Sequence, residues 1–149
     1  MNHCGTKLIE TDRLILRKLS TDDAEAMYNN WANDPEITKY LTWPPHDNAD
    51  ATRKLLTLWT QKYEKQNYYQ WGIELKAIGE VIGTISVVGM REEIDMVHIG
   101  YCIGKRWWHQ GIMTEALNTV IKFFFNDVGC NRIESRNDKN NPQSGDVMK

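Results

Sequence analysis

The spacing of hydrophobic residues changes along the chain, and each spacing predicts a different element. Near the N-terminus, Leu14 and Leu16 fall on one face of a two-residue repeat, which predicts a strand over 13–17. The segment 20–33 begins with a Ser-Thr-Asp-Asp helix start and then carries apolar residues at the i, i+3, i+4, i+7 spacing of an amphipathic helix. Pro35 ends this helix, because the residue before a proline is pushed out of the helical region.

The remaining segments continue this mixture of strand and helix periods. A short helical turn and a loop over 36–48 precede a second helix over about 50–65. Alternating apolar residues then predict strands, and a later apolar stripe predicts a helix. These elements are strands over 69–75 and 80–88 joined by a tight turn at 78–80, a strand over 96–103, a helix over 113–126 and a strand over 131–136. The order β-α-α-β-β-β-α-β predicts one α+β domain over residues 1–149.

Composition sets limits on the class of protein. The chain has 149 residues, of which 41% are hydrophobic and 26% charged, as in an ordinary soluble domain. Its apolar runs are far shorter than the roughly 18 residues that a membrane-spanning helix needs. A net charge of −2 gives no global attraction to nucleic acid or to anionic lipid. We therefore expect neither a nucleic-acid partner nor a membrane partner.

Cysteine and histidine usage indicates the redox setting and the absence of a metal. The three cysteines, Cys4, Cys102 and Cys130, are an odd number without paired spacing, which is typical of reduced thiols in a cytosolic protein. The four histidines are scattered and show no metal-ligand spacing. The first seven residues carry no signal-peptide pattern. We expect a cytoplasmic protein that binds no metal.

The junction between the strand over 96–103 and the following helix is a candidate anion site. The first backbone N–H groups of a helix lack intrahelical acceptors, and here they belong to residues 110–114. Gly111 lets the backbone approach a phosphate closely, and Thr114 is able to donate its hydroxyl. Lys105 and Arg106 add positive charge just upstream. The alternative is an ordinary strand–turn–helix junction with a glycine in the turn.

The residues around this junction resemble a known family. The segment Ile-Gly-Tyr-Cys-Ile at 99–103, followed by Trp-Trp-His-Gln-Gly-Ile-Met-Thr-Glu-Ala-Leu at 107–117, is similar to the acetyl-CoA-binding core of the GCN5-related N-acetyltransferases, the GNAT family. The similarity is greatest to its RimJ/RimL-like branch of ribosomal-protein N-terminal acetyltransferases. It extends from residue 11 over nearly the whole chain. Further matching segments lie at 11–17, 79–85, 132–136 and 141–144.

This resemblance implies a fold and a cofactor site. The family has a mixed, mostly antiparallel sheet flanked by helices, in which acetyl-CoA lies between a fourth and a fifth strand, here 96–103 and 131–136. The family's pyrophosphate loop corresponds to 108–113, where the central glycine is kept as Gly111 while Trp108 and Met113 depart from the pattern. The resemblance implies that acetyl-CoA contacts Tyr101, Cys102, Ile103, Arg106, Trp108, His109, Gln110, Gly111, Ile112, Met113, Thr114 and Asn141. Independently of the family, Cys102 has no partner in sequence that would activate it, and a small core residue is the alternative for that position.

The resemblance also implies two candidate catalytic residues. His98 stands where family members often carry a glutamate before the Gly-Tyr pair, and an imidazole is suited to remove a proton at neutral pH. A water chain is the alternative base. Ser144 matches a position from which the family protonates the leaving thiolate. His109 is either adjacent to CoA or on the surface, and Tyr40, Trp43 and the loop 44–49 are candidates for lining the acceptor pocket.

The family pattern continues beyond this chain. After the Asn-Pro-x-Ser loop at 141–144, family members add a helix and two strands, whereas this sequence ends at Lys149. The resemblance therefore implies a GNAT domain that lacks the C-terminal helix and last strands, and an uncovered strand edge invites association into a homodimer.

Three functions follow from the sequence. The first is an N-acetyltransferase that moves an acetyl group from acetyl-CoA to a primary amine, either a protein N-terminus or a small amine. The second is a non-catalytic acyl-CoA-binding or regulatory domain. The third is a phosphate or nucleotide binder of another fold. The identity of the acceptor amine is not encoded in any motif of the chain.

Overall fold

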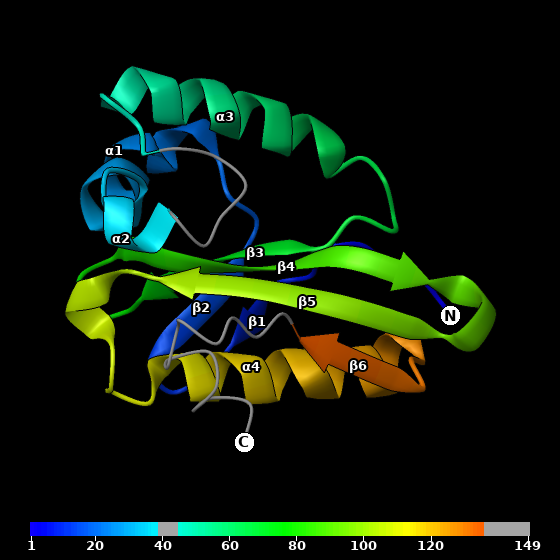
Figure 1. Ribbon diagram of the computed structural model, residues 1–149. Coiled ribbons are helices and arrows are strands. Elements are labelled where there is room, and N and C mark those ends of the chain that lie inside the picture. Colours follow the sequence, from blue (N-terminus) through cyan, green and yellow to red (C-terminus); the bar gives the residue numbers. More distant parts are fainter. Residues whose placement is uncertain (39–44, 136–149) are drawn as a thin grey trace.

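The described part of the chain folds into one curved sheet with helices on both faces (Figure 1). The computed structural model describes residues 1–38 and 45–135, with only the backbone of Thr38 and Ser135. The strands are β1 (Ile9–Glu10), β2 (Leu14–Arg17), β3 (Gln70–Leu75), β4 (Glu80–Arg91), β5 (Met96–Ile103) and β6 (Arg132–Ser135). The helices are α1 (Ala24–Met27), α2 (Pro35–Thr38), α3 (Ala49–Lys62) and α4 (Ile112–Phe123).

The sheet follows the order of the chain, from β1 at one edge to β6 at the other. Neighbouring strands pair antiparallel except β5 and β6, which are parallel. The parallel pairing runs from Met96 opposite Arg132 to Ile99 opposite Ser135. The second half of β5, Gly100–Ile103, pairs with β4 on one side and lies past the last described residue of β6. This geometry confirms the predicted GNAT-like α+β fold with a mixed, mostly antiparallel sheet.

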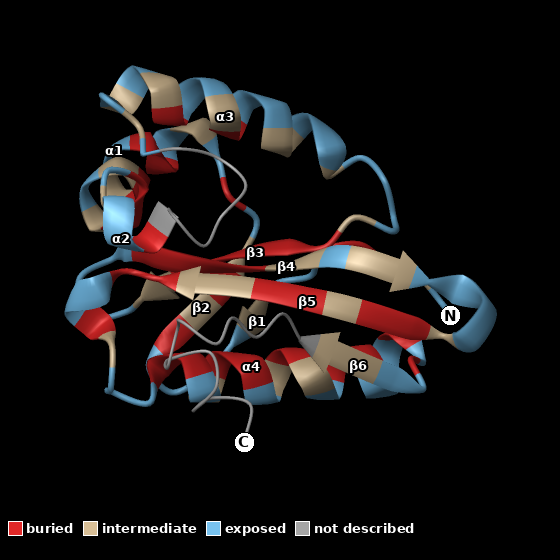
Figure 2. Ribbon diagram, in the orientation of Figure 1, coloured by how far each residue is buried: buried red, intermediate tan, exposed pale blue. Residues whose placement is uncertain are grey.

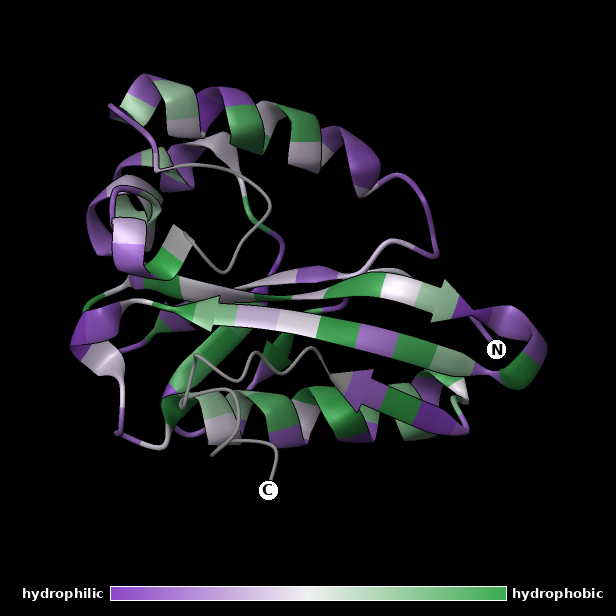
Figure 3. Ribbon diagram, viewed as in Figure 1, coloured by the Kyte–Doolittle hydropathy of each residue, from purple (hydrophilic) through white to green (hydrophobic). Residues whose placement is uncertain are grey.

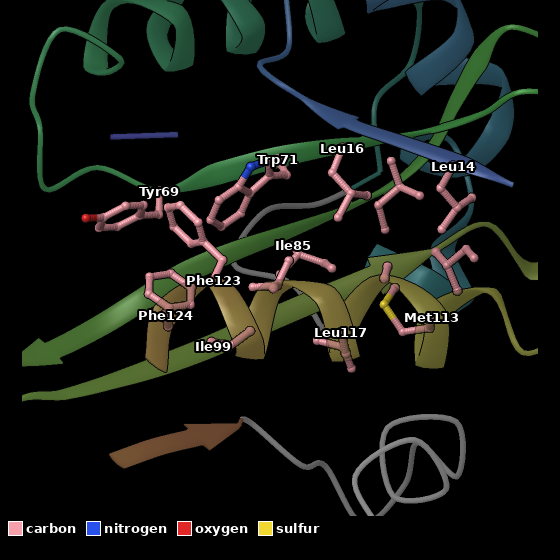
Figure 4. Close-up of a cluster of buried hydrophobic side chains, with 14 of the residues drawn as sticks. Leu14, Leu16, Tyr69, Trp71, Ile85, Ile99, Met113, Leu117, Phe123 and Phe124 are labelled. Atoms are coloured by element: carbon pink, nitrogen blue, oxygen red, sulfur yellow. The ribbon is translucent and has the colours of Figure 1, made fainter. Parts of the chain in front are cut away.

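Two hydrophobic clusters hold the layers together. Helix α4 covers one face of the sheet, while α1, α2 and α3 lie on the opposite face (Figure 1). On the α4 side, the aromatic rings of Phe123 and Phe124 pack edge-on against Tyr69 and Trp71 of the β3 region, with centroids 5.0 to 6.1 Å apart (Figure 4). On the other side, Trp31 is fully buried in a smaller cluster. The central strands are accordingly the most buried part of the fold (Figure 2).

The alternation along β5 decides which residues face each layer. Val97, Ile99 and Ile103 belong to the cluster under α4, whereas Cys102 packs with the cluster under α1 and α3. In Figure 3 the first half of β5 carries one hydrophilic position between hydrophobic ones, as in the run Val-His-Ile, while its second half is more mixed. His98 lies an even number of residues from Cys102, so it shares the face that looks away from α4.

Some elements differ from the sequence prediction. Strand β1 was not predicted, because two residues carry no periodicity. The helix expected over 20–33 is divided into a 3₁₀ turn (Thr21–Asp23), α1 and a π-helical turn (Tyr28–Ala32), and the wider turn places both Trp31 and Ala32 in the core. Strand β4 runs to Arg91 rather than ending at 88, because a bulge between Val87 and Gly89 restores its pairing with β5.

Candidate functional site

The loop between β5 and α4 is anchored by its aromatic residues. Trp107 is buried in the core, and the indole N–H of Trp108 donates to the carbonyl of Ile103 at 3.0 Å. Gly104 lies so close to the neighbouring backbone that an added Cβ would stand 2.5 Å from the carbonyl oxygen of Asn30. The two tryptophans therefore fix the loop, and Trp108 is held by its own strand.

A pocket opens at the N-terminus of α4, where the sequence predicts an anion site. It has a volume of about 230 Å³. Its lining consists of Ile103, Trp107, His109, Gln110, Gly111, Ile112, Met113 and Thr114. The lining thus includes seven of the predicted CoA-contacting residues, namely Ile103, His109, Gln110, Gly111, Ile112, Met113 and Thr114, together with Trp107.

The backbone in this pocket has the form of an anion-binding turn. Gly111 caps α4 with a φ of 73°, and His109 has a φ of 64°, so two left-handed residues flank Gln110. The first hydrogen bond of the helix runs from the amide of Glu115 to the carbonyl of Gly111 at 3.1 Å. The amides of residues 111–114 consequently have no acceptor inside the helix, and the positive end of the helix dipole lies behind them. This arrangement favours a phosphate or pyrophosphate group.

The predicted upstream cations lie outside the pocket lining. Lys105 forms an ion pair with Glu36, which raises the pKa of the Lys105 ammonium above its ordinary value. The guanidinium of Arg106 stands over the ring of Trp107 at 5.2 Å. Both side chains therefore have partners beside the loop: Lys105 pairs with Glu36 of α2, and Arg106 stacks on the indole of Trp107.

The second half of β5 leads from this pocket along the sheet. Tyr101 packs against the cluster under α4, whereas Cys102 lies on the other face, its Sγ 3.4 Å from the hydroxyl of Thr84. Burial raises the pKa of the Cys102 thiol, so the residue remains protonated and unreactive at neutral pH. The structure thus gives Cys102 the surroundings of a small core residue.

His98 lies on β5, on the face away from α4. It stands in register with Gly89 of β4 and Glu134 of β6, and it is half-buried. Among the described residues, the imidazole of His98 makes no hydrogen bond or ion pair, although its backbone lies within the sheet. Val88, the extra residue of the β4 bulge, is 55% exposed, and its Cγ1 would lie 2.9 Å from a Cβ placed on Gly100. The side chain of His98 therefore lies on a strand surface that also carries Gly100 and the exposed side chain of Val88.

Other predicted site residues lie outside the described part of the chain. These are Tyr40, Trp43, Asn141 and Ser144. Conversely, the structure brings to the loop two residues that had no predicted role, Arg13 before β2 and Glu115 in the first turn of α4. The sequence signal for both was their place inside the matching segments 11–17 and 107–117.

Two further features concern the described residues as a whole. No group of three or more His, Cys, Asp or Glu side chains in residues 1–38 and 45–135 is placed to hold a metal ion. Within these same ranges, no helix is long and apolar enough to cross a membrane.

Comparison with known proteins identifies relatives of this chain. The family model of the acetyltransferase (GNAT) domain matches residues 13–149. The uncharacterized N-acetyltransferase YoaA of Bacillus subtilis is 31% identical over 126 residues, which cover 85% of this chain and 71% of that protein. The [ribosomal protein uS5]-alanine N-acetyltransferase of Escherichia coli is 24% identical over 146 residues, covering 94% of this chain and 74% of the relative.

A solved structure matches the fold over almost the whole chain. It is that of a candidate ribosomal-protein-serine acetyltransferase from Vibrio cholerae, with a TM-score of 0.86 and 23% sequence identity. The match covers 97% of this chain and 82% of the other.

Proposed function

Because the chain belongs to the GNAT acetyltransferase family, we propose that it moves the acetyl group of acetyl-CoA to a primary amine, the N-terminus of a protein or a small amine. The observation that carries this proposal is the pocket at the start of α4, where Gly111 adopts the left-handed conformation and the amides of residues 111–114 have no acceptor within the helix. Residues 1–149 act in this proposal as one acetyltransferase domain.

In this proposal, the pyrophosphate of acetyl-CoA lies on the amides of residues 110–114. The pantetheine arm then follows the second half of β5, past the end of its pairing with β6. At about 3.4 Å per residue, the five steps from Ile103 back to His98 span about 17 Å of strand. The thioester would thus lie between the pocket and His98, and the exposed surface near His98 would receive the amine.

The reaction needs few side chains. The neutral amine nitrogen attacks the thioester carbonyl carbon, the carbonyl oxygen takes the negative charge, and a backbone N–H of β5 stabilises it. The C–S bond then breaks, which gives an amide and the thiolate of CoA. We assign the amine proton to His98 and the proton delivered to the thiolate to Ser144, with Asn141 contacting the cofactor.

For the acceptor, we favour the α-amino group of a protein N-terminus over a small amine. The support is the 24% identity to an enzyme named for acetylating an alanine of a ribosomal protein. The acceptor would approach over the part of the face opposite α4 that carries His98 and Val88, because the Val88 side chain is 55% exposed there.

The proposed cellular location and partners rest on the state of the cysteines and on the net charge. The three cysteines are free thiols in the structure, which supports a cytoplasmic location. The net charge of −2 supports an enzyme without nucleic-acid or membrane partners. We include a homodimer in the proposal, and light scattering of the purified protein measures its mass directly.

The proposed function is tested by release of CoA thiol from acetyl-CoA. The purified chain is incubated with acetyl-CoA and a panel of amines, including peptides that begin with alanine or serine and small polyamines. We expect thiol release that depends on at least one amine, with the acetylated product confirmed by mass spectrometry. Tight binding of acetyl-CoA without transfer to any amine would instead identify a non-catalytic acyl-CoA-binding domain.

A further inference from the structure

An arginine from the start of the chain holds the loop that forms the pocket. The guanidinium of Arg13, immediately before β2, donates from Nη1 to the carbonyl oxygen of Gln110 at 3.0 Å. Its Nε donates to Oε1 of Glu115 at 2.7 Å, across 102 residues of sequence. One planar side chain therefore bridges the turn before α4 and the first turn of the helix.

Both oxygens of the Glu115 carboxylate accept hydrogen bonds from residues that immediately precede β2. Its second oxygen, Oε2, accepts from the backbone N–H of Arg13 at 3.1 Å and from the hydroxyl of Thr11. Burial works against the charged form, but these hydrogen bonds from Thr11 and Arg13 outweigh it and lower the pKa of Glu115. Glu115 is thus a charged carboxylate at neutral pH, one helical turn from the proposed pyrophosphate site.

The bond to Gln110 sets the direction of the next amide. In a trans peptide the C=O and N–H point in opposite directions, so holding the carbonyl of Gln110 also fixes the N–H of Gly111. Arg13 does not line the pocket, whereas Gly111 does, and the Nη2 of Arg13 would stand 3.7 Å from a Cβ on Gly111. Arg13 therefore lies behind the loop and turns the Gly111 N–H away from itself, toward the pocket.

We infer that Arg13 is a positioning residue for acetyl-CoA: it orients the Gln110–Gly111 peptide toward the pyrophosphate and neutralises Glu115, whose charge would otherwise repel that anion. This inference rests on the proposed function, because it assigns the pocket to the pyrophosphate. It predicts a role confined to the nucleotide end of the cofactor, since Arg13 contacts the loop and the helix start rather than β5.

The test compares acetyl-CoA with acetyl-pantetheine, a thioester donor that lacks the pyrophosphate. Loss of a charged hydrogen bond that orients one amide, together with a Glu115 carboxylate left without its counter-charge, predicts that Arg13→Gln weakens CoA binding by about tenfold or more. The KM for acetyl-CoA rises in parallel, while kcat/KM for acetyl-pantetheine changes little. Arg13→Lys keeps the charge but not the two-pronged geometry, and we expect it to fall between the wild type and Arg13→Gln.

A second substitution separates charge from folding. In the Arg13→Gln background, Glu115→Gln removes the unpaired carboxylate, and we expect part of the lost CoA affinity to return. The matched control is Arg53→Gln, which breaks an exposed ion pair with Asp50 on α3 and should leave CoA affinity unchanged. Circular dichroism checks that each variant is folded, and Arg13→Lys carries the comparison if Arg13→Gln is not.

The outcomes distinguish the inference from the proposed function. If the wild type binds CoA and Arg13→Gln binds it equally well, the inference is overturned while the proposed function stands. A parallel loss of activity with acetyl-pantetheine would also overturn it, because Arg13 would then act on general stability. A wild-type chain that neither binds CoA nor uses acetyl-CoA refutes the proposed function and the inference together.

Discussion

Replacing Gly111 by valine tests the pocket at its central residue. Gly111 adopts a φ of 73°, a conformation that costs an L-residue about 1–2 kcal/mol, and a β-branched residue at the upper end of that range. Space is not the obstacle, since the nearest heavy atom to an added Cβ is the Nη2 of Arg13 at 3.7 Å. The substitution therefore acts through the backbone conformation of the loop.

The expected loss of affinity follows from this strain. If pyrophosphate binds only the observed loop conformation, valine lowers the population of that conformation, and the apparent dissociation constant for CoA rises by about 5–30-fold. Isothermal titration calorimetry with CoA measures this change. Gly111→Asn should lose less affinity, because asparagine tolerates the left-handed region better than valine does.

A second left-handed glycine provides the control. Gly129 ends the π-helical turn Phe124–Val128 that follows α4, with a φ of 85°, and no heavy atom lies within 4 Å of a Cβ placed on it. Gly129→Val should therefore cost comparable stability without changing CoA affinity. Unchanged CoA affinity in Gly111→Val, or an equal loss in Gly129→Val, would refute the placement of the pyrophosphate on this loop.

Three further predictions concern the reacting end of the cofactor and the thiol beside it. At saturating acetyl-CoA, His98→Gln should lower turnover by about 10²–10⁴-fold and flatten the rise of rate with pH, and a wild-type pH profile in this variant would leave a water chain as the base. Ser144→Ala should lower turnover with little change in CoA affinity, because the lost hydrogen bond forms mainly in the transition state, and an unchanged kcat would remove Ser144 from the mechanism. Since burial raises the pKa of the Cys102 thiol, iodoacetamide should modify Cys102 only as the pH rises well above neutral, which peptide mapping by mass spectrometry detects, and Cys102→Ala should leave turnover near that of the wild type.

The periodic elements of the fold were predictable from local sequence. Strands β3 and β5 each repeat their apolar residues several times on one face, so a two-residue period is visible without tertiary information. The bulge in β4 was not visible, because it depends on where Val87 and Gly89 meet β5 across the sheet. The same limit applies to β1, whose two residues become a strand only by pairing with β2.

In the candidate site too, features that depend on local sequence were predictable, and those that depend on long-range contacts were not. Gly111 was predictable because its conformation, the strand before it and the helix after it lie in one continuous segment. Arg13 and Glu115 were not, since nothing in either neighbourhood indicates that residues 102 positions apart share a hydrogen bond. Their roles become visible only when the first turn of α4 is placed beside the entry to β2.

The departures from the family's pyrophosphate motif have a structural explanation that supports a site built from backbone. At the two ends of the motif, Trp108 and Met113 replace the family's usual residues, yet the indole of Trp108 bonds to the carbonyl of Ile103 and Met113 is 5% exposed within the core. Both side chains therefore stabilise the loop by packing. The groups that would meet an anion are amides, which every residue except proline supplies. The two positions at which the residue type matters are thus Gly111, which permits the turn, and Arg13, which holds the turn through the carbonyl of Gln110.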